Sequence, residues 1–210
     1  MNYFEETQRM VEFTETEWVK LCKEYKVDDV EFHLCSPITY TGYVLLYSRQ
    51  TEITHGTLVD IFNDLTNGHN HLIAVAMAYY TFDEDDLIDS SNFAVLMSYE
   101  SLCDAMMKLD FQIDRIKIYL RNVLKHEIGH ILDYKSSFII GKTRGEYFIK
   151  EQKLNQRNKR RYNKWINDNP DANDEIKLRK SHGRLSERRA NKMVGLTWED
   201  FLPYESTGGK

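Results

Sequence analysis

The chain has 210 residues, of which 41% are hydrophobic and 12% aromatic, with only 3 Pro and 10 Gly. This length suits one domain and this composition supplies a core of helices and strands, which disfavours a disordered tail, a solenoid and a multi-domain machine. No apolar run reaches the roughly 18 residues that a bilayer-spanning helix needs, and the opening segment is acidic where a signal peptide is basic and then apolar. We therefore expect a cytoplasmic protein with no membrane segment.

Charge is distributed unevenly along the chain. The formal net charge is −5, yet residues 142–192 hold 16 Lys and Arg against 7 Asp and Glu, whereas the remainder holds 12 against 26. Three cysteines, Cys22, Cys35 and Cys103, form no CxxC pair, and their odd number argues against a disulfide framework. We expect them to be reduced core residues.

The first half of the chain predicts one helix followed by strands. Thr14 and Glu17 have the spacing of a capping box, which predicts a helix that begins there and runs over 15–25. Several later runs are rich in β-branched and aromatic residues, as strands of a mixed sheet are. These expected strands are 30–35, 39–48, 72–82 and 93–99, with a short helix over 57–65.

From Glu100 the apolar spacing becomes helical. One predicted helix carries the apolar stripe Leu102, Ala105, Met106 and Leu109. A second begins near Asp114 and continues for about five turns. Its apolar positions are Ile116, Leu120, Val123, Leu124, Ile131 and Leu132. Basic residues 142–166 are expected to be helical, followed by a loop over 167–174 and a last helix over 185–195.

The second of these helices contains His126-Glu127-Ile128-Gly129-His130, an HExxH motif. Side chains four positions apart share one helix face, so both imidazoles can reach a single Zn²⁺ at about 2.0–2.1 Å. Glu127 lies about 100° around the helix and can contact a metal-bound water without ligating the metal. The motif predicts two zinc ligands and a general base; the alternative is a pair of surface histidines on an ordinary helix.

A catalytic zinc needs a third protein ligand, with its fourth position left for water. The segment Ser186-Glu187-Arg188-Arg189-Ala190-Asn191 favours Glu187, since Ala190 permits its helix to pack closely and Asn191 faces the same side. We therefore predict that Glu187 completes the ligand set.

HExxH on one helix and Glu-x-x-Ala-Asn on a later one resemble the gluzincin branch of the zincin metallopeptidases. The resemblance covers these two short segments and implies zinc as cofactor and Glu187 as a ligand. It also implies that Asn191 hydrogen-bonds a ligand histidine. A Leu-Pro pair follows the Glu187 helix, here Leu202-Pro203, and this feature resembles small cytoplasmic zincins that regulate phage repressors and stress responses. The 57 residues between His130 and Glu187 are more than expected in that family.

Other polar residues are candidates for supporting roles. Asp133 lies about 20° from His126 on the helical wheel, and we expect it to accept a hydrogen bond from a ligand or to face solvent. In the predicted mechanism Glu127 takes a proton from a zinc-activated water and then protonates the leaving amine. Candidate donors to the developing oxyanion are His182, Tyr162, Tyr134 and Tyr147. An extended peptide substrate could add as a strand beside 72–82 or 93–99.

The basic segment has a second interpretation. Its cations, interleaved with Tyr162 and Trp165, resemble the electrostatic footprint of a nucleic-acid contact. These cations are Lys153, Arg157, Lys159, Arg160, Arg161 and Lys164. A solvated helix face is the favoured interpretation, and an acidic protein partner is the third.

Together these patterns predict a single α+β zincin-like domain over 1–210. We expect a mixed-sheet lobe with the HExxH helix over 1–135 and a helical lobe over 142–196 that carries Glu187. The predicted function is a zinc-dependent peptidase that hydrolyses an intracellular protein substrate. The competing hypotheses are a zincin-scaffold protein that binds nucleic acid or an acidic partner through 142–166, and a structural or assembly protein with a remnant zinc motif.

Overall fold

The computed structural model describes residues 3–27, 30–36, 39, 74–80, 91–137, 157–158 and 160–201. The chain divides into two compact units, Met1–Glu127 and Ile128–Lys210, and the division falls inside the HExxH helix. The sub-lobe boundary expected from the sequence lies between 135 and 142. Two statements stay predictions: that residues 1–210 form one domain, and that its fold is zincin-like.

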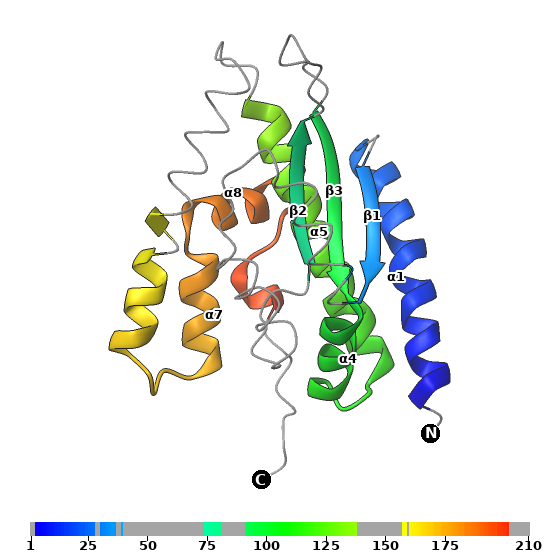
Figure 1. The fold of residues 1–210 in the computed structure, drawn as a ribbon, viewed down its shortest axis with the longest axis horizontal. Helices are drawn as coiled ribbons and strands as arrows, with labels where there is room; N and C mark the ends of the chain where they lie inside the picture. The colour runs from blue at the N-terminus through cyan, green and yellow to red at the C-terminus, as the bar shows by residue number, and fades with distance from the viewer. Residues whose placement is uncertain are drawn as a thin grey trace. The chain divides into compact units, whose positions relative to one another are not determined.

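The first unit contains a three-stranded mixed sheet. Its strands β1 (Val30–Cys35), β2 (Ala74–Tyr80) and β3 (Ser91–Ser98) lie in the order β1-β3-β2 (Figure 1). Strand β1 runs parallel to β3 and β2 runs antiparallel to it, so the expected mixed sheet is confirmed. The predicted strands over 30–35, 72–82 and 93–99 are confirmed within a few residues, whereas 39–48, apart from Thr39, and 57–65 lie outside the described residues.

Strand β3 is the central strand, with hydrogen-bonded neighbours on both sides. Its apolar run from Phe93 to Met97 is almost fully buried, as expected of a strand covered on both faces. The expectation that 93–99 could accept a peptide as an added strand is therefore wrong, because its backbone groups are already paired. Among the described strands, β2 keeps an outer position.

The first helix, α1 (Tyr3–Tyr25), begins well before the predicted start. Thr14 is buried in mid-helix and its Oγ1 donates to the carbonyl of Met10 at 2.7 Å, so the predicted capping box is wrong. Within a helix, a threonine hydroxyl can donate its hydrogen bond to a backbone carbonyl of the preceding turn. The helix extends past Thr14 in both directions because Met10, Trp18 and Leu21 form one buried face. Trp18 also stacks on Phe32 of β1, with ring centroids 5.2 Å apart.

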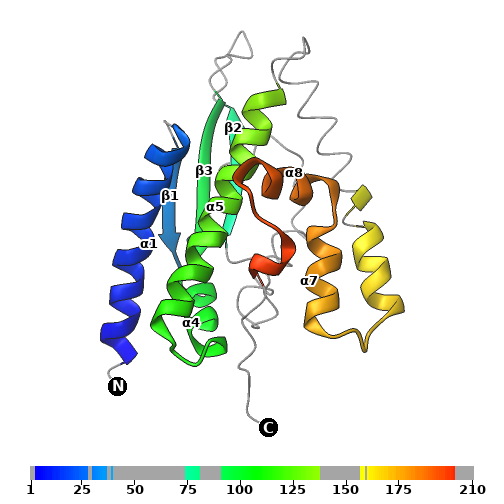
Figure 2. The same ribbon diagram turned by 180° about the vertical axis from the view of Figure 1, so that it is seen from behind.

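Two further helices follow β3 as predicted. Ser98 caps α4 (Tyr99–Lys108) by accepting the backbone N–H of Ser101 at 3.0 Å, and the predicted stripe of α4 is buried. Helix α5 (Ile113–Ser137) begins within one residue of its predicted start. Figures 1 and 2 show the part of α5 up to Glu127 lying across one face of the sheet. Its Arg121 forms an ion pair at 3.2 Å with the buried Glu17 of α1.

The second unit is helical in its described part. Residues 160–168 form one helix and are followed by α7 (Asp174–His182), α8 (Leu185–Val194) and the short η2 (Trp198–Phe201). The predicted last helix is confirmed as α8, which ends at Gly195 with a φ of 70°. Helix α7 was not predicted, because its apolar residues Ile176 and Leu178 are two positions apart and make no helical stripe. Asn173 caps it by accepting the N–H of Ile176 at 2.9 Å.

None of the helices in the described part of the chain is both long enough and apolar enough to cross a membrane.

Candidate metal centre

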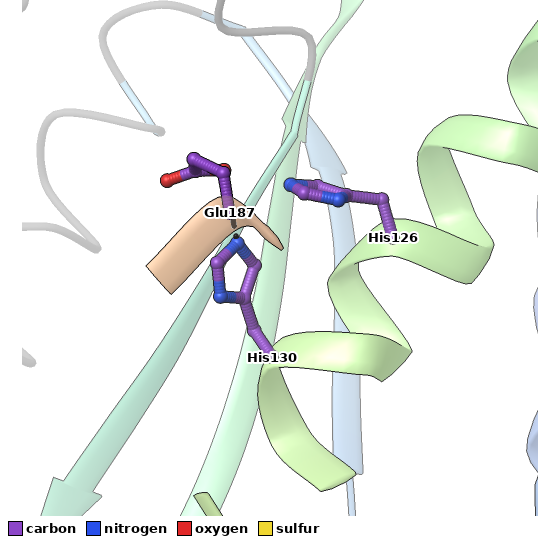
Figure 3. Close-up of side chains that lie close together, drawn as sticks. All are labelled: His126, His130 and Glu187. Carbon is purple, nitrogen blue, oxygen red and sulfur yellow. Dashed lines mark ion pairs between the residues drawn. The ribbon is translucent and has the colours of Figure 1, made fainter. Parts of the chain in front are cut away.

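His126 and His130 extend from α5 one turn apart, and their rings point to a common region (Figure 3). His126 is buried, whereas the side chain of His130 is 27% exposed. Ile128 and Ile131, on the other side of the same helix, are buried as well. The ring nitrogens are therefore held by a rigid, well-packed element.

Glu187 approaches this histidine pair from α8 (Figure 3). It is the third residue of that helix, where the unpaired N–H groups of the first turn favour a carboxylate. Its side chain is 15% exposed, and its Oε2 lies 3.4 Å from Nε2 of His130. A carboxylate from a distant segment thus faces a ring nitrogen of the HExxH motif.

The ligand atoms of His126, His130 and Glu187 all lie within 4.8 Å of one another. Within the described residues, this is the only group of three or more His, Cys, Asp or Glu side chains with such spacing. Two ligands about 2.1 Å from a tetrahedral ion are about 3.4 Å apart, which matches the 3.4 Å between His130 and Glu187. Two imidazoles and one carboxylate form a donor set that zinc accepts in catalytic centres, so both chemistry and spacing fit zinc.

Close packing of α8 on α5 depends on Gly129. A Cβ added at this position would lie 2.2 Å from the backbone carbonyl oxygen of Ala190, so only glycine permits the observed approach. The neighbouring Arg189 donates from Nε to the carboxylate of Asp133 at 2.9 Å. These two contacts fix α8 one turn beyond Glu187 and direct that residue toward His130.

The second carboxylate oxygen of Glu187 faces polar partners within its own unit. Oε1 accepts the hydroxyl of Ser186 at 3.3 Å and forms an ion pair with Nη2 of Arg184, also at 3.3 Å. Arg184 is itself held in place, because it donates to the backbone carbonyl of Ser181 at 3.0 Å and to its hydroxyl at 3.2 Å. The two oxygens of Glu187 are thus divided between His130 on one side and Arg184 with Ser186 on the other.

The candidate base and the candidate supporting residue are both buried. Glu127 and Asn191 are each 5% exposed. Asn191 lies one turn after Glu187 on α8, as predicted, and its backbone carbonyl accepts the N–H groups of Gly195 and Leu196. Asp133, expected to support a ligand or to face solvent, has a carboxylate that pairs with Arg189 and is 15% exposed. The catalytic and supporting roles of these residues stay predictions.

Tyr162 takes part in helix packing. Its hydroxyl donates to the carbonyl of Lys177 at 3.5 Å, and its ring lies 5.8 Å from the guanidinium of Arg184. Burial raises the pKa of the Tyr162 hydroxyl, and the positive charge of Arg184 partly offsets that rise. The side chains of His182 and Tyr134, and all of Tyr147, lie outside the described residues, so no candidate oxyanion donor is selected.

The basic segment is described only in part. Four of its six predicted contact residues are exposed, whereas Lys153 and Lys159 lie outside the described residues. The exposed ones are Arg157, Arg160, Arg161 and Lys164. Nζ of Lys180 lies 5.5 Å from the centroid of the half-buried Trp165 ring, so one face of that ring is already occupied.

Two arginines of this region were missed by sequence reasoning. The spacing of Arg184 and Glu187 was a usable signal, because opposite charges three residues apart on a helix commonly form an ion pair, and these two do. Arg189 had no local signal, because its partner Asp133 is 56 positions away.

No protein-family profile matches the chain, and neither the curated protein sequences nor the solved structures contain a significant match to it. The functional interpretation therefore depends on the residues of the centre itself.

Proposed function

We propose that this chain is a zinc-dependent peptidase in which His126, His130 and Glu187 hold the metal and Glu127 is the general base. The observation that carries the proposal is the 3.4 Å approach of the Glu187 carboxylate to His130. An HExxH pattern can occur by chance on any helix. The arrival of a carboxylate from a later helix is independent of that pattern, and it supplies the one ligand that the motif lacks.

The donor set also supports hydrolysis rather than a purely structural metal. The described residues supply three ligands, which would leave one position of a tetrahedral ion for water or substrate, whereas structural zinc sites are closed by four. When bound, zinc lowers the pKa of a coordinated water and polarises a substrate carbonyl. We also propose that the chain has a zincin-like fold and that its substrate is an intracellular protein.

The chain's own residues supply the proton transfers and the alignment. Glu127, which is buried, would accept a proton from the attacking water and deliver it to the leaving amine. Arg184 and Ser186 hold Oε1 of Glu187, which leaves Oε2 directed toward His130. Gly129 keeps α8 close enough to α5 for this orientation.

Two substitutions separate metal binding from chemistry. Glu187→Gln removes the anionic ligand, and we expect zinc affinity to fall by at least about a hundredfold, measured by competition with a chromophoric chelator. Glu127→Gln keeps all three ligands, so we expect stoichiometric zinc by elemental analysis together with loss of peptide hydrolysis. Glu175→Gln, at an exposed position of α7, is the matched control and should leave both properties unchanged.

The proposal fails if Glu187→Gln binds zinc as tightly as the wild-type chain. It also fails if Glu127→Gln hydrolyses peptides at the wild-type rate.

A further inference from the structure

We infer that Arg184 is an anion-binding residue of the proposed peptidase and that it selects substrates with a carboxylate close to the scissile bond. The inference rests on the proposed function and adds a substrate class to it. It is carried by the placement of Arg184 beside Glu187, by the restraint of its side chain and by its unused hydrogen-bonding capacity.

Arg184 lies beside one of the proposed metal ligands. Nη2 of Arg184 lies 3.3 Å from Oε1 of Glu187, whose other oxygen faces His130. A substrate group bound to Arg184 would therefore lie about one amino-acid residue away from the metal ligands. Both helices concerned, α7 and α8, belong to the second unit, and the turn between them carries Arg184.

The guanidinium is restrained before any ligand arrives. Nε donates to the carbonyl of Ser181 at 3.0 Å, Nη2 donates to its hydroxyl at 3.2 Å, and the ring of Tyr162 supports the cation at 5.8 Å. A side chain fixed in this way loses little conformational entropy on binding, which makes it an efficient recognition group.

One nitrogen of the guanidinium, Nη1, is unused. Within the part of the chain that the structure describes, Nη1 of Arg184 has neither a hydrogen-bond partner nor an ion-pair partner, and the side chain is 28% exposed. Nη1 carries two N–H groups, which can donate to a carboxylate oxygen. Arg184 can therefore accept a second carboxylate without releasing Glu187.

Charge balance favours an anionic substrate over a neutral or cationic one. A divalent ion held by two neutral imidazoles and one carboxylate leaves one positive charge, which the carboxylate of Glu127 would offset, and Arg184 adds another beside it. Glu187 is the single acidic residue of α8, whose own cations are Arg188, Arg189 and Lys192. Asp133 pairs with one of these, Arg189. A substrate carboxylate would offset the remaining excess, whereas a basic substrate would be repelled.

The test uses a peptide that the wild-type protein cleaves, identified from a random peptide mixture by mass spectrometry of the products. Derivatives with Glu, Gln or Lys at each position flanking the cleaved bond are then compared as substrates of the wild type, Arg184→Gln and Arg184→Lys. Arg161→Gln, which removes an exposed arginine in the same unit, is the charge-matched control.

At one flanking position we expect the Glu peptide to exceed the Gln peptide by about tenfold in kcat/KM, mainly through KM. The Lys peptide should be the poorest. Arg184→Gln should bring the Glu-to-Gln ratio close to one, Arg184→Lys should restore part of it, and Arg161→Gln should leave it unchanged. Binding of the Glu peptide to the zinc-loaded Glu127→Gln variant, followed by fluorescence anisotropy, should weaken on adding Arg184→Gln.

Two results would overturn the inference alone. The first is efficient hydrolysis with the same Glu-to-Gln ratio in the wild type and Arg184→Gln. The second is a loss of zinc from Arg184→Gln as large as that from Glu187→Gln, which would make Arg184 a positioning residue for the ligand. A wild-type chain that binds no zinc and cleaves no peptide would instead overturn the proposed function, and this inference with it.

Discussion

The two units are stabilised in different ways. Almost all of the largest fully buried side chains among the described residues belong to the first unit, and the two from the second, Ile128 and Ile131, both lie on α5. Cation–ring contacts are more numerous in the described part of the second unit, as in Arg179 with Trp198 and Lys180 with Trp165, although the first unit also has one, between Lys117 and Phe13. Such contacts contribute about 0.5–1 kcal/mol each at exposed sites. Among the described residues, the first unit therefore has the larger hydrophobic core, whereas the second, in which Val194 and Phe201 are also buried, has more cation–ring contacts and, by our proposal, a metal.

Truncating the core of the first unit should have the largest effect. Leu96 is fully buried at the centre of β3, so Leu96→Ala should lower the free energy of unfolding by about 2–5 kcal/mol, measured by urea denaturation. Val19 of α1 is 52% exposed, and Val19→Ala should cost less than about 0.5 kcal/mol. Equal losses from the two variants would contradict a core centred on β3.

Zinc should stabilise the second unit more than the first. At a free concentration about a hundredfold above Kd, a ligand that binds only the folded state contributes about 2.7 kcal/mol. Hydrogen exchange should therefore slow in α7 and α8 on zinc addition, with little change in β1 and β3. The Glu187→Gln variant should show no such slowing, and a uniform slowing throughout the chain would contradict the contrast between the units.

Gly129→Ala should disrupt the second unit selectively. The added methyl group would lie 2.2 Å from the carbonyl oxygen of Ala190, and forcing α8 away should cost about 1–3 kcal/mol. We expect zinc affinity to fall with it, because Glu187 moves with its helix. Ser136→Ala, near the exposed end of the same α5 helix, is the control. Unchanged zinc binding in Gly129→Ala would show that α8 does not need this close approach.

The smallest effect concerns the buried thiol of the first unit. Burial, with a smaller contribution from Glu100, raises the pKa of Cys35 from 9.0 to about 11. The folded state holds this proton more tightly than the unfolded chain does, so the resulting stability is full below pH 9 and is lost as the pH rises toward 11. At pH 8 the thiolate fraction should be about a hundredfold smaller than in the unfolded protein. Labelling by a disulfide reagent, read by mass spectrometry, should be slow with or without zinc.

Elements with strong apolar periodicity were predictable. The stripe of α4 and the start of α5 follow from spacing alone, because each buries one continuous face. The capping-box error at Thr14 shows the limit of a local signal. The same hydroxyl that can cap a helix bonds to the carbonyl of Met10 when burial of the surrounding face extends the helix.

The residues of the candidate centre could be predicted from the sequence, whereas the packing that brings them together could not. The motif identified His126 and His130, and the choice of Glu187 followed from the need for a third ligand together with Ala190, Asn191 and the resemblance to gluzincins. Spacing does not reveal which backbone contact brings α8 to α5, because the approach of Ala190 to Gly129 joins residues 61 positions apart. Arg184 lies outside the basic segment 142–166 and belongs to neither motif, so only its spacing of three residues from Glu187 pointed to it.

The contact at Gly129 has a consequence for protein engineering. It is made to a main-chain carbonyl, so it places no demand on side-chain chemistry beyond the absence of a Cβ at one position. Two helical turns of α5 and two of α8 therefore contain the whole proposed ligand set together with the joint that aligns it. We expect such a pair, grafted onto an unrelated two-helix scaffold, to act as a minimal metal-binding hairpin.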